Sequence, residues 1–177
     1  MTYLTSKKVL VAYFSHTGEN YAVGNIAKGN THIVAELIAE LTDGCLFEIA
    51  PEKKYPSNYN ACIDIAKKEM KAGARPAING DINVDDYDVV FIGYPNWWGD
   101  MPMAVYTLIE RHNWQGKTVA PFCTHEGSGL ASTPSRVAEA CEGATMAKGL
   151  AVRGATAQTD SEATRRAVEQ WLEQLHV

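Results

Sequence analysis

Three short segments carry side chains suited to binding a phosphate and a flat ring. The first begins with Ser-His-Thr-Gly (residues 15–18) after an apolar run, and Asn30 and Thr31 open a helical pattern further on. Backbone N–H groups at a helix start, beside serine and threonine hydroxyls, favour phosphate. Because residues 19–29 separate the two halves, two interpretations stay open. Either this is one phosphate site with an insertion, or it is an ordinary turn in which Thr31 caps the helix.

The second segment is "YPNWWGDMP", residues 94–102. Its adjacent tryptophans, Trp97 and Trp98, cannot both point into one core, so at least one is expected to be exposed or to cover a ligand. An indole at a ligand crevice is a stacking surface for a planar ring. The alternative is that both indoles pack on neighbouring helices or on a partner subunit.

The third segment is "THEGSG", residues 124–129. Its backbone amides and small polar side chains can serve the edge of a ring. The same pattern is equally typical of a flexible turn, with Ser132 or Thr133 capping the following helix.

Apolar runs alternate with helical periodicity along the chain, which predicts a parallel sheet with helices on both faces. Right-handed crossovers then give a three-layer, doubly wound α/β fold in one domain, residues 1–177, with five strands in the order 2-1-3-4-5. Pro121 indicates a local irregularity in the fourth strand. Strands are expected over residues 9–15, 46–50, 88–94, 118–124 and 146–152, and helices over 31–41, 61–72, 103–112, 134–141 and 160–175. In this order, ligands bind beyond the carboxyl ends of strands 1 and 3, where the three segments lie.

The composition bears on partners and location. A net charge of −5 with mixed signs gives no footprint for nucleic acid, and no apolar run approaches the roughly 20 residues of a membrane span. Two lysines before the first apolar run resemble the start of a signal peptide, but the run is short and ends without a cleavage site. We therefore expect a strand there and a cytoplasmic protein. No metal site is expected, because the cysteines have no metal-ligand spacing: Cys45, Cys62, Cys123 and Cys141.

Other uses of this architecture need residues that the chain lacks. A phosphatase would need a cysteine and an arginine in the first segment, and a phosphoacceptor domain would need an aspartate at the end of a central strand. A dinucleotide-binding domain would need G-x-G-x-x-G after the first strand. A serine hydrolase would need G-x-S-x-G, whose spacing "EGSGL" does not have.

Together, Ser-x-Thr-Gly with Asn-Thr, the tryptophan loop and the glycine-rich third segment resemble the flavodoxin family over essentially the whole chain. The resemblance implies FMN as the cofactor. It assigns residues to a phosphate loop and to two loops around the flavin ring. The phosphate-loop residues are Ser15, His16, Thr17, Gly18, Asn30 and Thr31; the ring-loop residues are Pro95, Asn96, Trp97, Trp98 and Gly99, then Thr124, His125, Glu126, Gly127 and Ser128.

The family's phosphate loop is usually unbroken, so residues 19–29 depart from the pattern. We expect this insertion to form a lid or to contact a partner, with Tyr21 as the residue of interest. Negative charge on Asp100 and Glu126, both expected near the ring, should lower the reduction potential of the flavin.

Two functions follow from the resemblance. One is an oxidoreductase that takes hydride from NAD(P)H and reduces a quinone, nitro compound or similar acceptor; the other is an electron carrier that docks on a larger redox protein. The mild acidity tilts towards the enzyme, although no nicotinamide site and no catalytic residue is evident. A flavin-free interaction module would leave the tryptophan loop without a reason. A homodimer is left open.

Overall fold

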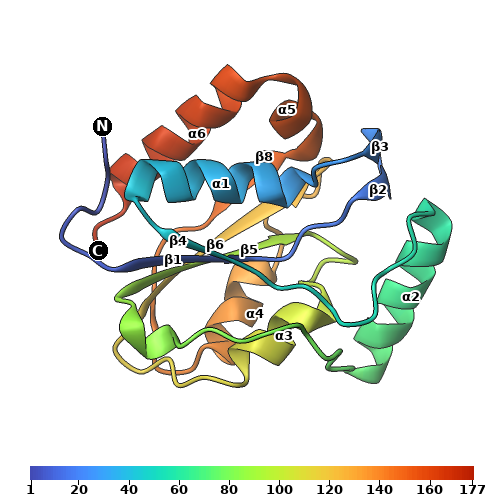
Figure 1. Cartoon of the computed structure of the whole chain (residues 1–177), viewed down its shortest axis with the longest axis horizontal. Helices are drawn as coiled ribbons and strands as arrows, with labels where there is room; N and C mark the ends of the chain where they lie inside the picture. The colour runs from blue at the N-terminus through green and yellow to red at the C-terminus, as the bar shows by residue number, and fades with distance from the viewer.

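A parallel sheet forms the centre of the molecule. The structure, a computed structural model, describes residues 1–177, and Figure 1 shows helices above and below the sheet. The strands run in the order β4-β1-β5-β6, with β7 and β8 both pairing with β6, and every pair is parallel. This confirms the predicted order 2-1-3-4-5. The bounds are β1 (Val9–Tyr13), β4 (Cys45–Glu48), β5 (Val89–Pro95), β6 (Thr118–His125), β7 (Thr145–Met146) and β8 (Leu150–Arg153).

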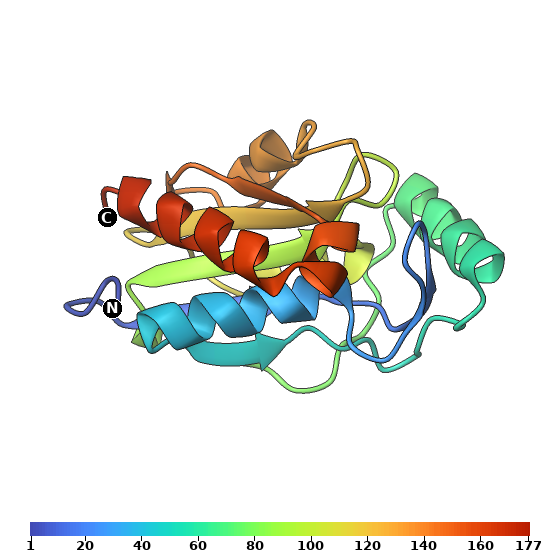
Figure 2. The ribbon, with the colours of Figure 1, turned by 90° about the horizontal axis from the view of Figure 1, so that it is seen from above.

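Helices cover both faces, as the alternation of patterns predicts. One face carries α1 (Asn30–Thr42), α5 (Gly154–Thr159) and α6 (Ser161–Gln174), and the other carries α3 (Met103–Ile109) and α4 (Thr133–Ala140). Seen from above in Figure 2, α1 and α6 lie side by side across the sheet. None of the helices combines the length and the apolar character that crossing a bilayer would require.

Each central strand feeds two cores by simple alternation. In β1, Leu10 and Ala12 join the core under α3 and α4, while Val9 and Val11 join the core under α1 and α6. Successive side chains of a strand point to opposite faces, and all of β1 is buried. The two cores thus fix the register of the sheet and the positions of its strand ends.

One end of the molecule departs from the layered plan. The insertion after β1 forms an antiparallel hairpin of β2 (Gly18–Asn20) and β3 (Gly24–Ile26), a structure the sequence did not predict. Figures 1 and 2 both place this hairpin beside α2 (Tyr59–Ala72), away from the sheet. Only Cys62 and Ala66 are buried in α2. A short 3₁₀ helix, η1 (Val84–Asp86), precedes β5.

The predicted last strand is divided in two. Thr118 and Val119 of β6 pair with β7, and from Phe122 onward β6 pairs with β8. The register shifts by one residue between the two, because the last strand has one more residue than β6 between the paired segments. The break lies opposite Pro121, which has no N–H to donate, whereas β6 itself, where the irregularity was expected, runs without interruption from Thr118 to His125.

The carboxyl-terminal helix was predicted over residues 160–175 with Asp160 or Ser161 as its N-cap, and in the structure it spans Ser161–Gln174. Asp160 is its N-cap and accepts a hydrogen bond from the Ala163 N–H at 2.9 Å. The preceding α5 was not predicted, because its sequence "GATAQT" has no apolar periodicity.

Candidate functional site

A cavity of about 350 Å³ lies at the carboxyl ends of β1, β5 and β6, where a doubly wound fold binds its ligands. It has two sides. The inner wall comes from the sheet loops and the start of α1: Asn30, Pro95, Asn96, Trp97, Thr124, His125, Glu126 and Ser128. The outer wall comes from the hairpin, α2 and the tip of the tryptophan loop: Asn20, Tyr21, Tyr59, Ile63, Ala66 and Trp98. Seven predicted residues do not line the cavity: Ser15, His16, Thr17, Gly18, Thr31, Gly99 and Gly127.

The two halves of the first segment meet across the insertion. The hydroxyl Oγ of Ser15 accepts a hydrogen bond from the His32 N–H at 3.1 Å, so it caps the first turn of α1 from the end of β1. The N-cap residue Gly29 supplies no side chain, and Thr31 lies inside the helix rather than capping it. An added Cβ on Gly29 would lie 2.0 Å from Ser15 Oγ, so only glycine permits this approach.

Unbonded donors gather in this loop. The backbone N–H groups of Thr17, Asn30 and Thr31 donate to no protein group, and two of them open a helix, where anions are stabilised. The His16 Nε2 atom is buried without a hydrogen-bond partner, and burial lowers the pKa of this imidazole. The donor set fits a phosphate group, which would be held by N–H dipoles and hydroxyls.

The second segment forms a tight hairpin turn. Trp97 and Asp100 exchange backbone hydrogen bonds of 2.9 and 3.1 Å, and the two residues between them have positive φ, 56° at Trp98 and 76° at Gly99. These angles are those of a type I′ turn. The Asn96 side chain steadies it by accepting from the Gly99 N–H at 3.0 Å. A tryptophan in a left-handed conformation is strained, which marks the position as a functional candidate.

The two tryptophans have different surroundings. Trp97 packs edge-to-face against Phe14 and Tyr55, with ring centroids 5.1 Å apart in both pairs. Trp98 is 47% exposed, and its indole N–H donates to the Ile63 carbonyl at 3.1 Å. Trp97 is therefore a fixed surface of the inner wall, while Trp98 reaches across to α2.

The third segment is tied to the other two. The buried hydroxyls of Thr31 and Thr124 lie 2.8 Å apart, which joins the start of α1 to the end of β6. The backbone N–H of Asn96 donates to the Thr124 carbonyl at 2.9 Å, and its side-chain amide donates to the Gly129 carbonyl at 3.1 Å. The three predicted segments thus form one cross-linked frame.

His125 presents a neutral ring to the cavity. Its Nδ1 accepts a hydrogen bond from the Gly127 N–H at 2.8 Å. Burial lowers the pKa of His125, and nearby Glu126 partly opposes the shift. With Nδ1 occupied as acceptor, the neutral tautomer carries its proton on Nε2.

Glu126 lines the cavity, but its carboxylate is already engaged. It accepts from the Ala155 N–H at 2.7 Å and lies 3.2 Å from the Arg153 guanidinium. Its negative charge is therefore partly compensated at the site.

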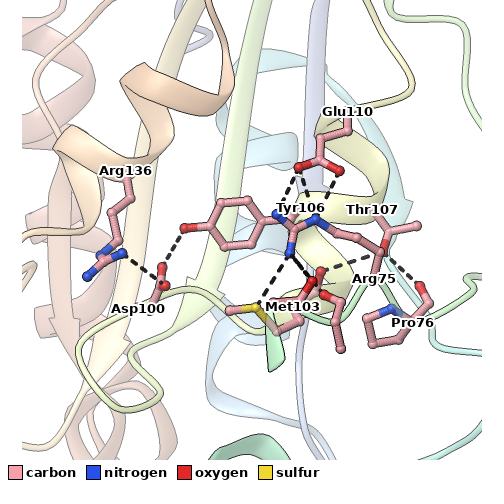
Figure 3. A network of polar contacts seen from close by, with 10 residues as sticks. Arg75, Pro76, Asp100, Met103, Tyr106, Thr107, Glu110 and Arg136 are labelled. Atoms are coloured by element: carbon pink, nitrogen blue, oxygen red, sulfur yellow. Dashed lines mark hydrogen bonds and ion pairs between the residues drawn. The ribbon is translucent and has the colours of Figure 1, made fainter. Parts of the chain in front are cut away.

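The expectation that Asp100 lies by the ring needs correction. Asp100 is 5% exposed and does not line the cavity. Figure 3 shows its carboxylate between Arg136 and Tyr106, at 3.4 Å from the guanidinium and 2.7 Å from the hydroxyl. Burial and the bond to Asp100 raise the pKa of Tyr106. Asp100 thus anchors the base of the turn, because its backbone closes the turn with Trp97 and its side chain is held by α3 and α4.

Sequence reasoning missed most of the outer wall. Tyr21 was singled out, but Asn20, Tyr59, Ile63 and Ala66 were not. The three α2 residues recur at i, i+4 and i+7, which places them on one helix face. That stripe is a usable signal, although nothing in the sequence places α2 opposite the tryptophan loop.

The chain belongs to the flavodoxin family, whose model, described as "Flavodoxin", matches residues 8–175. Among solved structures, a candidate flavoprotein from Bacteroides eggerthii is 34% identical, with a TM-score of 0.72, covering 93% of this chain and 98% of that one. A second from Bacteroides uniformis is 31% identical, with a TM-score of 0.76 and coverage of 94% and 98%. A flavoprotein from Lactobacillus acidophilus in complex with FMN is 27% identical, with a TM-score of 0.64 and coverage of 93% and 98%. No curated protein matches the chain significantly in sequence.

These relations settle the class of protein. The chain is a flavodoxin-like flavoprotein, and family membership together with the FMN complex of the Lactobacillus protein supports FMN as the cofactor.

Proposed function

We propose that the chain binds FMN in the cavity and acts as an FMN-dependent oxidoreductase on a small, quinone-like acceptor. The observation that carries the proposal is the cross-linked frame of three loops around a cavity of about 350 Å³. The size falls at the lower end of the usual range of ligand sites. In this proposal the FMN phosphate is held by the loop of Ser15–Gly18 and the start of α1.

The ring end of the cofactor is assigned to the inner wall. Trp97 offers a packed aromatic surface, and Asn96, Thr124, His125 and Ser128 offer hydrogen-bonding groups to a ring edge. Gly99 and Gly127 contribute backbone that needs little room, both with positive φ. Because these groups are fixed by bonds between the loops, little ordering would be needed on binding.

When bound, FMN supplies the redox chemistry: reduced by a nicotinamide-class donor, it passes two electrons and two protons to an acceptor such as a quinone, which becomes a hydroquinone. The protein's part is to hold the ring and to shield it on both sides. The outer wall supports an enzyme over a bare carrier, because it encloses the space in which a small acceptor would meet the ring.

A second candidate is an electron carrier that docks on a larger redox protein. The observation that favours it is the exposure of two aromatic side chains at the cavity, Tyr21 at 64% and Trp98 at 47%. Aromatic residues of this kind are enriched at protein interfaces.

Spectroscopy and turnover separate these candidates. Purified protein is titrated with FMN by flavin fluorescence, and the loaded protein is then mixed with NADH or NADPH, with and without a quinone. Uptake of FMN and quinone-dependent consumption of the nicotinamide support the enzyme. A yellow protein that is inert to both nicotinamides but is reduced by a flavoprotein reductase would indicate the carrier, and failure to bind FMN would end both.

A further inference from the structure

The two walls of the cavity differ in chemistry. The inner wall is rich in amide, hydroxyl and imidazole groups, whereas the outer wall is mainly aromatic and aliphatic: Tyr21, Tyr59, Ile63, Ala66 and Trp98. Flavins and quinones both have flat, largely apolar faces and carry their polar atoms at the ring edge. A polar wall suits such an edge, and an aromatic wall suits a face. The outer wall therefore suits the face of a second ring.

The hairpin holds the amino-terminal end of α2 in place. The Glu19 carboxylate accepts from the Tyr59 N–H at 2.9 Å and from the Asn58 side-chain amide at 3.2 Å. The Glu19 N–H donates to the Ser57 carbonyl at 2.8 Å. These bonds bring the Tyr21 and Tyr59 rings to a centroid distance of 6.1 Å, so the insertion and α2 act as one surface.

The tryptophan loop holds the middle of the same helix. The indole N–H of Trp98 donates to the Ile63 carbonyl, and the Lys67 ammonium lies 4.5 Å from the indole centroid. A cation over an indole is a stabilising contact. The outer wall is thus fixed by two loops of the site itself rather than by the core.

The charge distribution limits what this surface can bind. No lysine or arginine lines the cavity, and its one carboxylate, on Glu126, is paired with Arg153. The Lys67 ammonium lies over the Trp98 indole and does not line the cavity. A flat, uncharged ring would gain both from leaving water and from aromatic contact.

We propose that the outer wall is the acceptor subsite, that it takes a flat, uncharged aromatic acceptor of the quinone class, and that Tyr21 and Tyr59 set its specificity. This inference rests on the proposed function, because it assumes that FMN occupies the inner wall.

Binding to the oxidised, FMN-loaded protein tests the proposal without turnover. The probe is 2,3-dimethyl-1,4-naphthoquinone, followed by its perturbation of the flavin absorption band. Both reactive ring positions of this probe are blocked, which matters because the Cys45 thiol is exposed and would add to an unsubstituted quinone. Affinity for FMN is measured separately on each variant.

The variants are chosen to remove or keep one ring. Tyr21→Ala and Tyr59→Ala should each weaken probe binding by about tenfold, the scale of a lost aromatic contact with its buried area, and leave FMN affinity within about twofold. Tyr21→Phe and Tyr59→Phe keep the ring and should bind the probe like the wild type. Leu46→Ala is the control, an exposed apolar side chain (40%) on the edge strand β4, outside the cavity lining.

The possible results are distinct. Equal probe affinity in the wild type and both alanine variants would overturn the proposal while leaving FMN binding intact, as would a wild type that binds FMN but not the probe. If the alanine variants lose FMN affinity by the same factor as probe affinity, the outer wall belongs to the cofactor cradle and the acceptor assignment is wrong. A wild type that takes up no FMN refutes the proposed function itself, and this inference with it.

Discussion

The inner and outer walls of the cavity differ in how firmly the rest of the molecule holds them. The inner wall follows directly from buried strands and is closed by hydrogen bonds between its loops, including the pair of buried hydroxyls on Thr31 and Thr124. The outer wall rests on α2, of which only Cys62 and Ala66 are buried. A second cavity of about 360 Å³ lies against another side of this helix, beside Ile65 and Glu69.

Under the proposed function, this difference would pair a fixed cofactor frame with an adaptable acceptor side. A frame built on sheet ends inherits the rigidity of the core. A helix held by a few polar contacts has low local stability and can move at small cost. Two predictions, at Gly29 and at Glu19, test whether the walls differ in this way, and two more concern charged and titratable groups of the site's loops.

The largest effect is expected at Gly29, where the two halves of the first loop meet. In Gly29→Ala the new Cβ would lie 2.0 Å from Ser15 Oγ and 2.8 Å from the His16 carbonyl oxygen. We expect a loss of about 1–3 kcal/mol in the free energy of unfolding and FMN binding weaker by about tenfold or more. Urea denaturation and fluorescence titration with FMN measure the two quantities.

Gly24→Ala in the hairpin is the matched control for this change. Nothing lies within 4 Å of its added Cβ, although φ is +71°, so it should cost about 1 kcal/mol of local strain. FMN affinity should stay at the wild-type value. If Gly24→Ala weakens FMN binding as much as Gly29→Ala, the two walls are not independent.

Asp100 and Arg136 give the next effect, on the base of the tryptophan turn. Asp100→Asn should lower the free energy of unfolding by about 1–3 kcal/mol, the value of hydrogen bonds to a charged group. Removing the negative charge should also raise the reduction potential of bound FMN, and Arg136→Gln should lower it. Because the two charges lie 3.4 Å apart, the double variant should return close to the wild-type potential. Potentials that shift in the same direction in both single variants would contradict this pairing.

A smaller effect is expected from the contact that joins the hairpin to α2. Glu19→Ala removes the acceptor for the Tyr59 N–H, a loss of about 0.5–2 kcal/mol for a helix cap. Because α2 is little buried, the loss should appear as faster amide hydrogen exchange within α2, with FMN affinity almost unchanged. Glu139→Ala on the surface of α4 serves as the control. Uniformly faster exchange throughout the sheet would show that the outer wall is part of the global unit.

The smallest effect is a dependence of stability on pH from His16 and His125. Burial lowers the pKa of both rings in the folded state, below the unfolded value of about 6.5. The unfolded chain therefore binds protons first, and the stability that these rings contribute above pH 6.5 is lost as pH falls through their folded pKa values. The His16→Asn/His125→Asn variant should show a shallower loss of unfolding free energy between pH 7.5 and 5. An unchanged slope would mean that neither ring is stabilised in its neutral form.

Sequence patterns predicted the frame well because local signals and burial agree there. The strand order 2-1-3-4-5 and the meeting of three loops follow from alternating apolar runs and crossover rules. The second strand was predicted over residues 46–50, but β4 spans Cys45–Glu48. It is an edge strand with Cys45 and Leu46 exposed, so its ends are not marked by a buried apolar run. The fifth strand was predicted as one piece, because the one-residue change of register between β7 and β8 does not alter the pattern of apolar residues in the sequence.

The surroundings of individual side chains were less predictable. Trp97 and Trp98 are neighbours with the same residue type, yet one packs in an aromatic cluster and the other contacts α2. Asp100 was expected at the ring because it follows Gly99, but the type I′ turn directs it back towards Arg136 and Tyr106. Turn geometry and distant partners decide such directions, and neither is encoded in spacing alone.

The sequence by itself determined the architecture, the family and the segment "YPNWWGDMP", because these depend on periodicity and on residue types in a fixed order. Only the tertiary structure decided that Ser15 caps α1 across an insertion and that Glu19 of the same insertion caps α2. Both contacts join residues far apart in the chain, and their free energy exists only once the sheet has brought the strand ends together. The insertion that interrupts the first segment in sequence therefore leaves its two halves joined in space, and it contributes Asn20 and Tyr21 to the outer wall of the cavity.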